Sequence, residues 1–455
     1  MASDVAAKGA SSLKGFGLQT LSNLLLRAFQ LGALLLTTLV LARLLGPVQF
    51  GAYSYASSWL ALLAGFATVG FTHASVREVA QALALGRYAE ARSHIVTAYA
   101  ATLAAGVLAA GLVFLAQGRL FAAGASMAGA ASIGVALTPL LALLLVAQAV
   151  LRGQGLSIRA QLGELLLLPS FMLLATAWLA LAGPSWRTAD RALYLYGVSL
   201  LLAVIIGLGL QWRAPPAELR QGGARVDPKW VVAALPFLLV LVSVTISGQF
   251  DVLTVGGMRG AKETGVYALA ARLSLMPAVV LTAVGMPLSP AIAALFAKRE
   301  SAELQRLVGV AALVGALGSS AVAACVIVGA PWLTRLINPT FEAGGAALLI
   351  LCLGRVVESW FGPGGLVLAM TRHAWPAGIA VAIGAVASIA LNLLLVGRYG
   401  IEGAAAATAA SCLLRGFAMW YWARKYEGVR ASAIEALFSV ARRGPARRVS
   451  RPPDF

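Results

Sequence analysis

Four arginines lie within long apolar stretches of the chain, where charged residues are rare: Arg27, Arg272, Arg355 and Arg415. A guanidinium group stays charged and can donate two parallel hydrogen bonds to the oxygens of a phosphate group. A charge at the centre of a membrane-spanning helix costs about 2.5–3.5 kcal/mol, and such residues are usually retained for a substrate or ion pathway. We therefore predict that these four side chains contact a phosphate-bearing ligand.

Two carboxylates, Asp251 and Glu358, lie at comparable depth. Four cations against two anions leave these apolar stretches net positive, which favours a ligand with several negative charges. A simpler alternative is that Arg355 and Glu358, three residues apart on one helical face, only neutralise each other. Another is that Arg415 extends toward a helix end beside the aromatic residues 420–422, as long basic side chains do in membranes.

The composition indicates which elements hold these residues. Hydrophobic residues make up 60% of the chain and charged residues 11%, and the mean hydropathy is +0.86. Such a chain is surrounded mostly by lipid. Apolar runs of roughly 20 residues match the thickness of a bilayer and predict about twelve membrane-spanning helices. The expected spans cover residues 16–44, 50–72, 93–116, 128–151, 162–183, 192–212, 229–257, 265–296, 307–330, 344–370, 374–397 and 402–423.

An internal repeat indicates how the spans are arranged. The stretch Gly46–Tyr53 recurs as Gly260–Tyr267, with two glycines and a tyrosine at the same spacing. A duplicated set of helices is typical of secondary transporters, and an even number per half relates the halves by an axis along the membrane normal. We therefore expect an all-α integral membrane protein with two six-helix lobes around a V-shaped central cavity. The expected segments are an N-terminal lobe at 1–212, a cytoplasmic linker at 213–228, a C-terminal lobe at 229–424 and a basic cytoplasmic tail at 425–455.

The placement of basic residues predicts the topology. Roughly 23 lysines and arginines fall on the side of the N-terminus and roughly 8 on the other side, so both termini are expected in the cytoplasm. The net charge of +18 therefore reflects topology and contact with anionic lipids more than nucleic-acid binding. In the tail, Ile434, Leu437 and Phe438 form an apolar stripe typical of an interfacial helix. The three cysteines and three histidines have no metal-ligand spacing, so no metal cofactor is expected.

Several stretches of the chain resemble one family. They include Leu44–Tyr53, followed by Val76–Glu78, and the most specific is Asn392–Thr408, which ends in a run of small residues. Over nearly the whole chain these features resemble the Wzx-type polysaccharide and oligosaccharide lipid flippases of the multidrug/oligosaccharidyl-lipid/polysaccharide exporter superfamily. One departure is Gly397, where that family usually has a proline.

The resemblance implies a function. Members of the family move polyprenyl-diphosphate-linked oligosaccharide from the cytoplasmic to the periplasmic leaflet by alternating access, for O-antigen, capsule or exopolysaccharide assembly. The resemblance also places arginines that contact the lipid diphosphate in the regions of Arg27 and Arg272. The sequence has no ATP-binding motif, so an ion gradient is the expected driving force.

The residues expected to couple transport to that gradient are Asp251, Glu358, Asn392 and Thr408. Asp251 is a carboxylate within a span, and Asn392 and Thr408 resemble positions that line a sodium site in related lipid flippases. Oxygen ligands suit Na⁺, whereas a lone buried carboxylate suits H⁺. The choice between the two ions stays open, as does the alternative that Asn392 and Thr408 only form hydrogen bonds between helices.

Two other functions stay open. A multidrug exporter of the same superfamily would share the duplicated plan, but an interior richer in arginine than in carboxylate opposes organic cations. A membrane polysaccharide polymerase or glycosyltransferase would resemble the chain in hydropathy, but such enzymes generally carry a sizeable loop outside the membrane. We therefore expect a non-enzymatic, monomeric protein of the bacterial inner membrane. Its expected partners are the lipid-linked oligosaccharide, membrane lipids and the polysaccharide polymerase machinery, with no nucleic acid.

Overall fold

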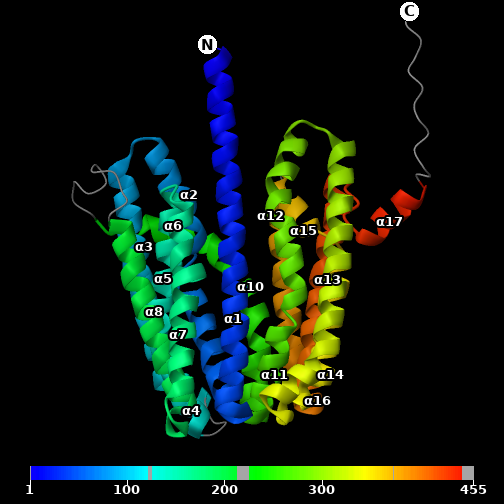
Figure 1. Cartoon of the computed structure of the whole chain (residues 1–455). Helices are drawn as coiled ribbons and strands as arrows, with labels where there is room; N and C mark the ends of the chain where they lie inside the picture. Colours follow the sequence, from blue (N-terminus) through cyan, green and yellow to red (C-terminus); the bar gives the residue numbers. More distant parts are fainter. Residues whose placement is uncertain (1, 121–124, 213–224, 372, 443–455) are drawn as a thin grey trace, which may run out of the picture. The chain divides into compact units, whose positions relative to one another are not determined.

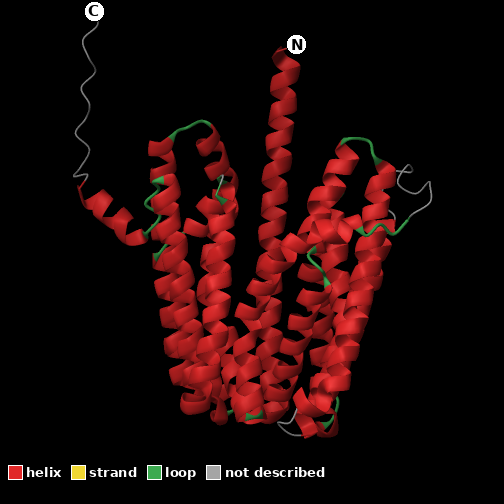
Figure 2. Cartoon of the chain, turned by 180° about the vertical axis from the view of Figure 1, so that it is seen from behind, coloured by secondary structure: helices red, strands yellow, loops and turns green. Residues whose placement is uncertain are grey.

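The computed structural model describes residues 2–120, 125–212, 225–371 and 373–442. These residues form helices joined by short turns, with no strand among them (Figure 2). Most of the expected linker at 213–228 and the end of the expected tail lie outside the described residues. The all-α class predicted from the apolar runs is confirmed for the described part of the chain.

The first half of the chain forms the helices that Figure 1 draws from blue to green. In the order of the chain they are α1 (Ala2–Ala67), α2 (Phe71–Ala84), α3 (Tyr88–Leu120), α4 (Ala125–Ala136), α5 (Thr138–Gly153), α6 (Ser157–Gln161), a π-helical turn (Leu162–Leu167), α7 (Leu168–Leu181), a 3₁₀ turn (Pro184–Trp186) and α8 (Ala189–Trp212). Helices α3, α5, α7 and α8 lie side by side (Figure 1).

The second half forms the helices that Figure 1 draws from green to red. They are α10 (Lys229–Arg259), α11 (Ala261–Leu273), α12 (Met276–Ala297), α13 (Ser301–Ile337), a 3₁₀ turn (Pro339–Gly344), α14 (Gly345–Trp360), α15 (Gly364–Met370), α16 (Ala374–Glu427) and α17 (Ala433–Arg442). Helices α12 and α15 pack against each other.

Ten helical segments among the described residues are long and apolar enough to cross a membrane. Two of them each hold a pair of spans, because α1 and α16 are interrupted at glycines with a positive φ: Gly46 at 68° and Gly400 at 60°. Glycine lacks a Cβ atom and adopts this backbone conformation readily. Counting each pair as two spans gives the twelve that the apolar runs predict.

The two copies of the repeated motif pack against each other where α1 meets α11. A Cβ atom on Gly51 would overlap the backbone carbonyl of Ala261, and one on Gly265 would overlap the backbone carbonyl of Pro47. The overlap is reciprocal, because Gly51 and Gly265 hold the same place in the two copies. The duplicated glycines therefore allow the backbones of α1 and α11 to approach closely.

The described residues fall into two compact units. The first unit comprises the described residues within Met1–Leu273, Ala330–Leu348 and Ser388–Ala407, and the second comprises those within Ser274–Gly329, Leu349–Ala387 and Thr408–Phe455. Part of the core of the first unit forms around the fully buried Phe71 and Val150. Part of the core of the second unit forms around Ile292 and Val308. The lobe limits expected from the sequence, 1–212 and 229–424, stay a prediction.

Candidate functional site

Arg272 lies in the last turn of α11 and has neutral neighbours in the first unit. Its Nη1 donates a hydrogen bond of 3.2 Å to Thr38 Oγ1 on α1. Its guanidinium carbon lies 5.6 Å from the centre of the Phe50 ring, within the range of a cation–π contact. Within the described part of the chain, Arg272 forms no ion pair with a carboxylate. A positive charge is thus held between two helices without a protein anion beside it.

Asp251 lies on α10 in the same unit and is held by a residue of the repeated motif. Its side chain is buried, and its Oδ2 accepts a hydrogen bond of 2.7 Å from the hydroxyl of Tyr267 on α11. Its Oδ1 accepts one of 2.7 Å from the backbone nitrogen of Val252. Tyr267 is itself completely buried. The second copy of the motif therefore supplies both the close helix crossing and the donor that fixes this carboxylate.

Asn392 presents a buried oxygen in the part of α16 that belongs to the first unit. Its Nδ2 donates to the backbone oxygen of Ser388 at 2.8 Å, whereas its Oδ1 has no hydrogen-bond partner among the described residues. One turn further along α16, the backbone oxygen of Val396 accepts a bond of 3.2 Å from Nε of Arg259, at the end of α10. An unpaired buried oxygen is costly, and a cation is one partner that would satisfy it.

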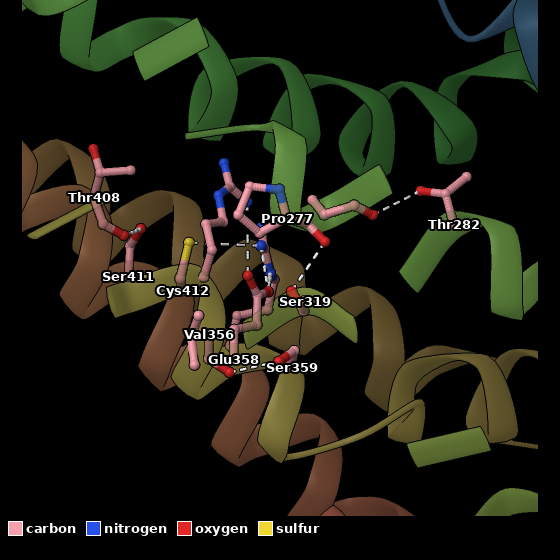
Figure 3. Close-up of polar contacts among 12 residues, drawn as sticks. Pro277, Thr282, Ser319, Val356, Glu358, Ser359, Thr408, Ser411 and Cys412 are labelled. Atoms are coloured by element: carbon pink, nitrogen blue, oxygen red, sulfur yellow. Dashed lines mark hydrogen bonds and ion pairs between the residues drawn. The ribbon is translucent and has the colours of Figure 1, made fainter. Parts of the chain in front are cut away.

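Glu358 on α14 is the centre of a charged cluster in the second unit (Figure 3). Its Oε2 lies 3.6 Å from Nη1 of Arg355, and its Oε1 accepts a hydrogen bond of 3.0 Å from Nε of Arg415 on α16. Nη2 of Arg415 donates to the same oxygen. About a fifth of each of these three side chains is exposed. Two cations share one carboxylate, so the cluster keeps a net charge of +1.

The geometry of this cluster bears on the two simpler alternatives raised by the sequence. The ion pair that the spacing of Arg355 and Glu358 predicts is present. It is not a complete neutralisation, because Arg415 adds a second positive charge to the same carboxylate. Arg415 also binds Glu358 rather than extending to the end of its helix.

The two remaining predicted site residues have mainly local contacts. Arg27 on α1 is half-buried, and its Nη1 lies 3.3 Å from Oε1 of Gln30, its hydrogen-bond acceptor one turn away. Thr408 on α16 is buried in the second unit, and its backbone oxygen accepts a hydrogen bond of 2.8 Å from the hydroxyl of Ser411. No cluster of three or more His, Cys, Asp or Glu side chains among the described residues could hold a metal ion.

The sequence did not identify the partners that hold these charged side chains. Thr38, Ser388 and the hydroxyl of Tyr267 lie on other turns or other helices from the residues they bind. Tyr267 did have a signal, since it is the tyrosine that recurs in the repeat. Its pairing with Asp251 depends on how α10 and α11 pack, which the spacing alone does not give.

Comparison with known proteins gives a family match and a similar fold. Residues 12–296 match the family model described as "Polysaccharide biosynthesis protein". The fold is similar to an inward-facing multidrug resistance MATE family transporter of the MOP superfamily, with 18% identity, a TM-score of 0.68, and coverage of 90% of this chain and 94% of that one. It is also similar to an outward-facing transporter of that description, at 17% identity, a TM-score of 0.59, and coverage of 89% and 94%.

A third similar structure is a MOP superfamily transporter from Pyrococcus furiosus, again at 17% identity and a TM-score of 0.59, with coverage of 89% of this chain and 94% of that one. No curated protein sequence matches the chain. At these identities the structural likeness shows the fold, and the apolar helices indicate a multi-pass membrane protein.

Proposed function

Because this chain belongs to the polysaccharide biosynthesis protein family, we propose that it is a flippase for polyprenyl-diphosphate-linked oligosaccharide. The lipid would move from the cytoplasmic to the periplasmic leaflet of the bacterial inner membrane by alternating access, driven by an ion gradient. The glycan would serve the assembly of O-antigen, capsule or exopolysaccharide at the cell surface. The protein would act as a carrier and not as an enzyme.

The observation that carries this proposal is the uncompensated charge of Arg272. Its contacts with the hydroxyl of Thr38 and the ring of Phe50 involve no anion. Withdrawing a cation from water without a counter-ion costs several kcal/mol. A diphosphate group provides several anionic oxygens in the geometry that a guanidinium binds best. Arg272 therefore suits a substrate that brings its own negative charge into the membrane.

The second unit supports the same class of substrate. Arg355 and Arg415 together exceed the single charge of Glu358, so this cluster would also attract an anion. Arg27, beside Gln30, is the fourth proposed contact. A carrier of organic cations would be expected to show the opposite balance, with carboxylates in excess. The similar transporter from Pyrococcus furiosus is described as having a binding pocket of reverse polarity, so the polarity of the binding pocket can differ among proteins of this fold.

The proposal is tested by changing Arg272 in protein reconstituted into liposomes. The measurement is the initial rate at which a fluorescent glycan on a polyprenyl diphosphate reaches the opposite leaflet, where an impermeant lectin can bind it. We expect Arg272→Ala to lower the rate at least tenfold, since a charge-assisted contact contributes about 1.5–3 kcal/mol. Arg272→Lys should retain an intermediate rate, because an ammonium group keeps the charge but not the bidentate geometry.

The matched control is Lys262→Ala, which removes one positive charge from an exposed position on the same helix. This variant should transport at the unmodified rate. If Arg272→Ala transports as fast as the control at equal protein density, Arg272 does not contact the substrate.

We propose that Asp251, Glu358, Asn392 and Thr408 couple transport to the ion gradient. Asp251 and the free Oδ1 of Asn392 both present buried oxygens in the first unit. Asp251 lies two turns before Arg259, and Asn392 lies one turn before Val396, to which Arg259 is bonded. The expected topology requires α10 and this part of α16 to run in the same direction. In that arrangement Asp251 lies about 12 Å, and Asn392 about 6 Å, before the contact between Arg259 and Val396 along their helices.

The coupling role is tested with Asp251→Asn in the same liposomes under an imposed Na⁺ or H⁺ gradient. Unmodified protein should transport faster under one of the two gradients, which identifies the ion. The variant should lose that stimulation while keeping the slow rate seen without a gradient. The control is Asp190→Asn, which changes an exposed acidic residue at the start of α8 and should keep the stimulation by the gradient. Full stimulation of Asp251→Asn would remove Asp251 from the coupling site.

A further inference from the structure

A groove at one end of the second unit is lined by none of the proposed transport residues. It has a volume of 1250 Å³ and is bounded by the end of α12, the start of α13 and the segment that leads into α17. Its exposed lining residues include Arg299, Arg306 and Arg430, and its accessible apolar ones include the exposed Val310 and the half-buried Leu313. We call it the α17 groove. It combines positive charge at its surface with an apolar wall.

The acidic residues of the α17 groove are already satisfied by other partners. Glu427 lies 2.7 Å from Nδ1 of His373. Glu435 accepts hydrogen bonds of 2.9 Å from Arg424 and 3.2 Å from the indole nitrogen of Trp420. The three arginines of the groove, in contrast, form no ion pair within the described part of the chain. The charge available to a ligand is therefore positive.

Hydrogen bonds fix the backbone at two of these arginines, Arg430 and Arg299. Gln305 Nε2 donates to the backbone oxygen of Arg430 at 2.7 Å, and the backbone nitrogen of Arg430 donates to Gln305 Oε1 at 2.7 Å. Arg299 closes α12, with its own nitrogen bonded to the oxygen of Phe296. Its φ is 59°, the left-handed region in which glycine is strongly favoured at the end of a helix. The backbone alone thus gives no reason for an arginine at position 299.

Helix α17 presents its large apolar side chains away from the bundle. Ala433 and Ala436 are buried, with Ala433 packed against α13, whereas Ile434, Leu437 and Phe438 are between 44% and 68% exposed. The helix runs obliquely to α13 (Figure 1). A short helix with basic neighbours and an exposed apolar face is typical of the membrane interface. The α17 groove is therefore next to a surface where lipid would meet the protein.

We propose that the α17 groove binds one anionic phospholipid of the bilayer. The head-group phosphate is held by Arg299, Arg306 and Arg430, and an acyl chain lies against the apolar wall, in which Val310 is exposed and Leu313 is half-buried. The charge of the three arginines selects an anionic head group over a zwitterionic one. The apolar wall and the exposed face of α17 select a lipid over a soluble phosphate. This site is independent of the proposed substrate.

The test is a lipid titration of the purified, delipidated protein in detergent, followed by native mass spectrometry. Phosphatidylglycerol should bind with a first site at least tenfold tighter than phosphatidylcholine of the same chains. Arg299→Gly, Arg306→Gln and Arg430→Gln should each weaken that site about fivefold, since a basic residue near a membrane surface contributes about that factor. Lys298→Gln removes a charge from the same turn outside the groove and should leave the site unchanged.

Arg299→Gly separates a loss of binding from a loss of folding. Glycine suits the positive φ at this position, so the melting temperature of this variant without lipid should be equal or higher. Equal binding of phosphatidylglycerol by the unmodified protein and by a variant that carries all three arginine substitutions would overturn the proposal. Displacement of the lipid by an equal concentration of inorganic phosphate or glycerol 3-phosphate would also overturn it, because the site would then take a free anion.

Discussion

The charged side chains within the helices differ in how each is compensated. Asp251 is satisfied by Tyr267, and Glu358 by two arginines, whereas Arg272 has only neutral partners. In a membrane protein such differences matter, because an uncompensated charge raises the energy of the resting state until a ligand or ion neutralises it. Where a charged side chain has its partner, as Asp251 and Glu358 do, removing the partner should lower the stability of the protein. Where the charge has no counter-ion, as at Arg272, removing the side chain should weaken substrate binding.

Tyr267→Phe tests the support of Asp251. Removing the hydroxyl leaves Oδ2 of a buried carboxylate without this donor, so we expect the free energy of unfolding to fall by about 1–3 kcal/mol. The measurement is thermal unfolding of the purified protein in detergent. Tyr399→Phe removes a hydroxyl from a side chain that is mostly exposed and should change nothing. Equal melting temperatures for both variants would show that the Tyr267 bond contributes little.

Glu358→Gln tests the shared carboxylate in the second unit. Without its charge, Arg355 and Arg415 repel each other in a partly buried site, and we expect a loss of about 2 kcal/mol. Replacing Arg355 with Gln in the same chain removes the repulsion and should restore part of the stability. Glu303→Gln, at an exposed position on α13, is the control. A double variant less stable than Glu358→Gln would contradict this account of the cluster.

Among the elements, the crossing of α1 and α11 depends most directly on particular residue types. Gly51 and Gly265 meet the backbone of the opposite helix, and the repeated motif places them symmetrically. The twisted backbone at Gly46 and at Gly260, with φ of 68° and 83°, precedes each of them by five residues. The repeat visible in the sequence therefore allows close helix packing, because the glycine in each copy leaves room for the backbone of the other copy.

Gly265→Ala should destabilise the protein by more than about 2 kcal/mol, because the added methyl group overlaps the backbone of Pro47, which cannot rotate away. Gly257→Ala is the matched control. It lies on α10, where a Cβ atom meets nothing within 4 Å, so the gain in helix propensity should leave stability equal or slightly higher. The two melting temperatures are compared in one detergent. Equal melting temperatures for the two variants would mean that α1 and α11 can move apart at little cost.

The elements were largely predictable from the sequence, and the contacts between them were not. The length of the apolar runs fixes where a chain can cross a bilayer, because the backbone must satisfy its hydrogen bonds within each segment. The kinks at Gly46 and Gly400 were also placed between expected spans. The partners of Asp251 and Arg272 lie on other helices, and their positions depend on packing that a hydropathy pattern does not encode.

At the scale of the whole chain, the family, the fold and the charge each support the proposed carrier function. The family model covers the first half and beyond, and the structural relatives cover about nine-tenths of the chain. The fold alone does not choose a substrate, because transporters of this fold are described for multidrug resistance. The choice rests on the excess of arginine within the helices, and therefore on Arg272 and the cluster at Glu358.

The most direct measurement compares substrates in one set of proteoliposomes. Transfer between leaflets is followed for a glycan on a polyprenyl diphosphate, the same glycan on a polyprenyl monophosphate, and uptake of a fluorescent organic cation. We predict transfer of the diphosphate at least tenfold faster than in protein-free liposomes, slower transfer of the monophosphate, and no uptake of the cation. Uptake of the cation with no transfer of the diphosphate would contradict the account.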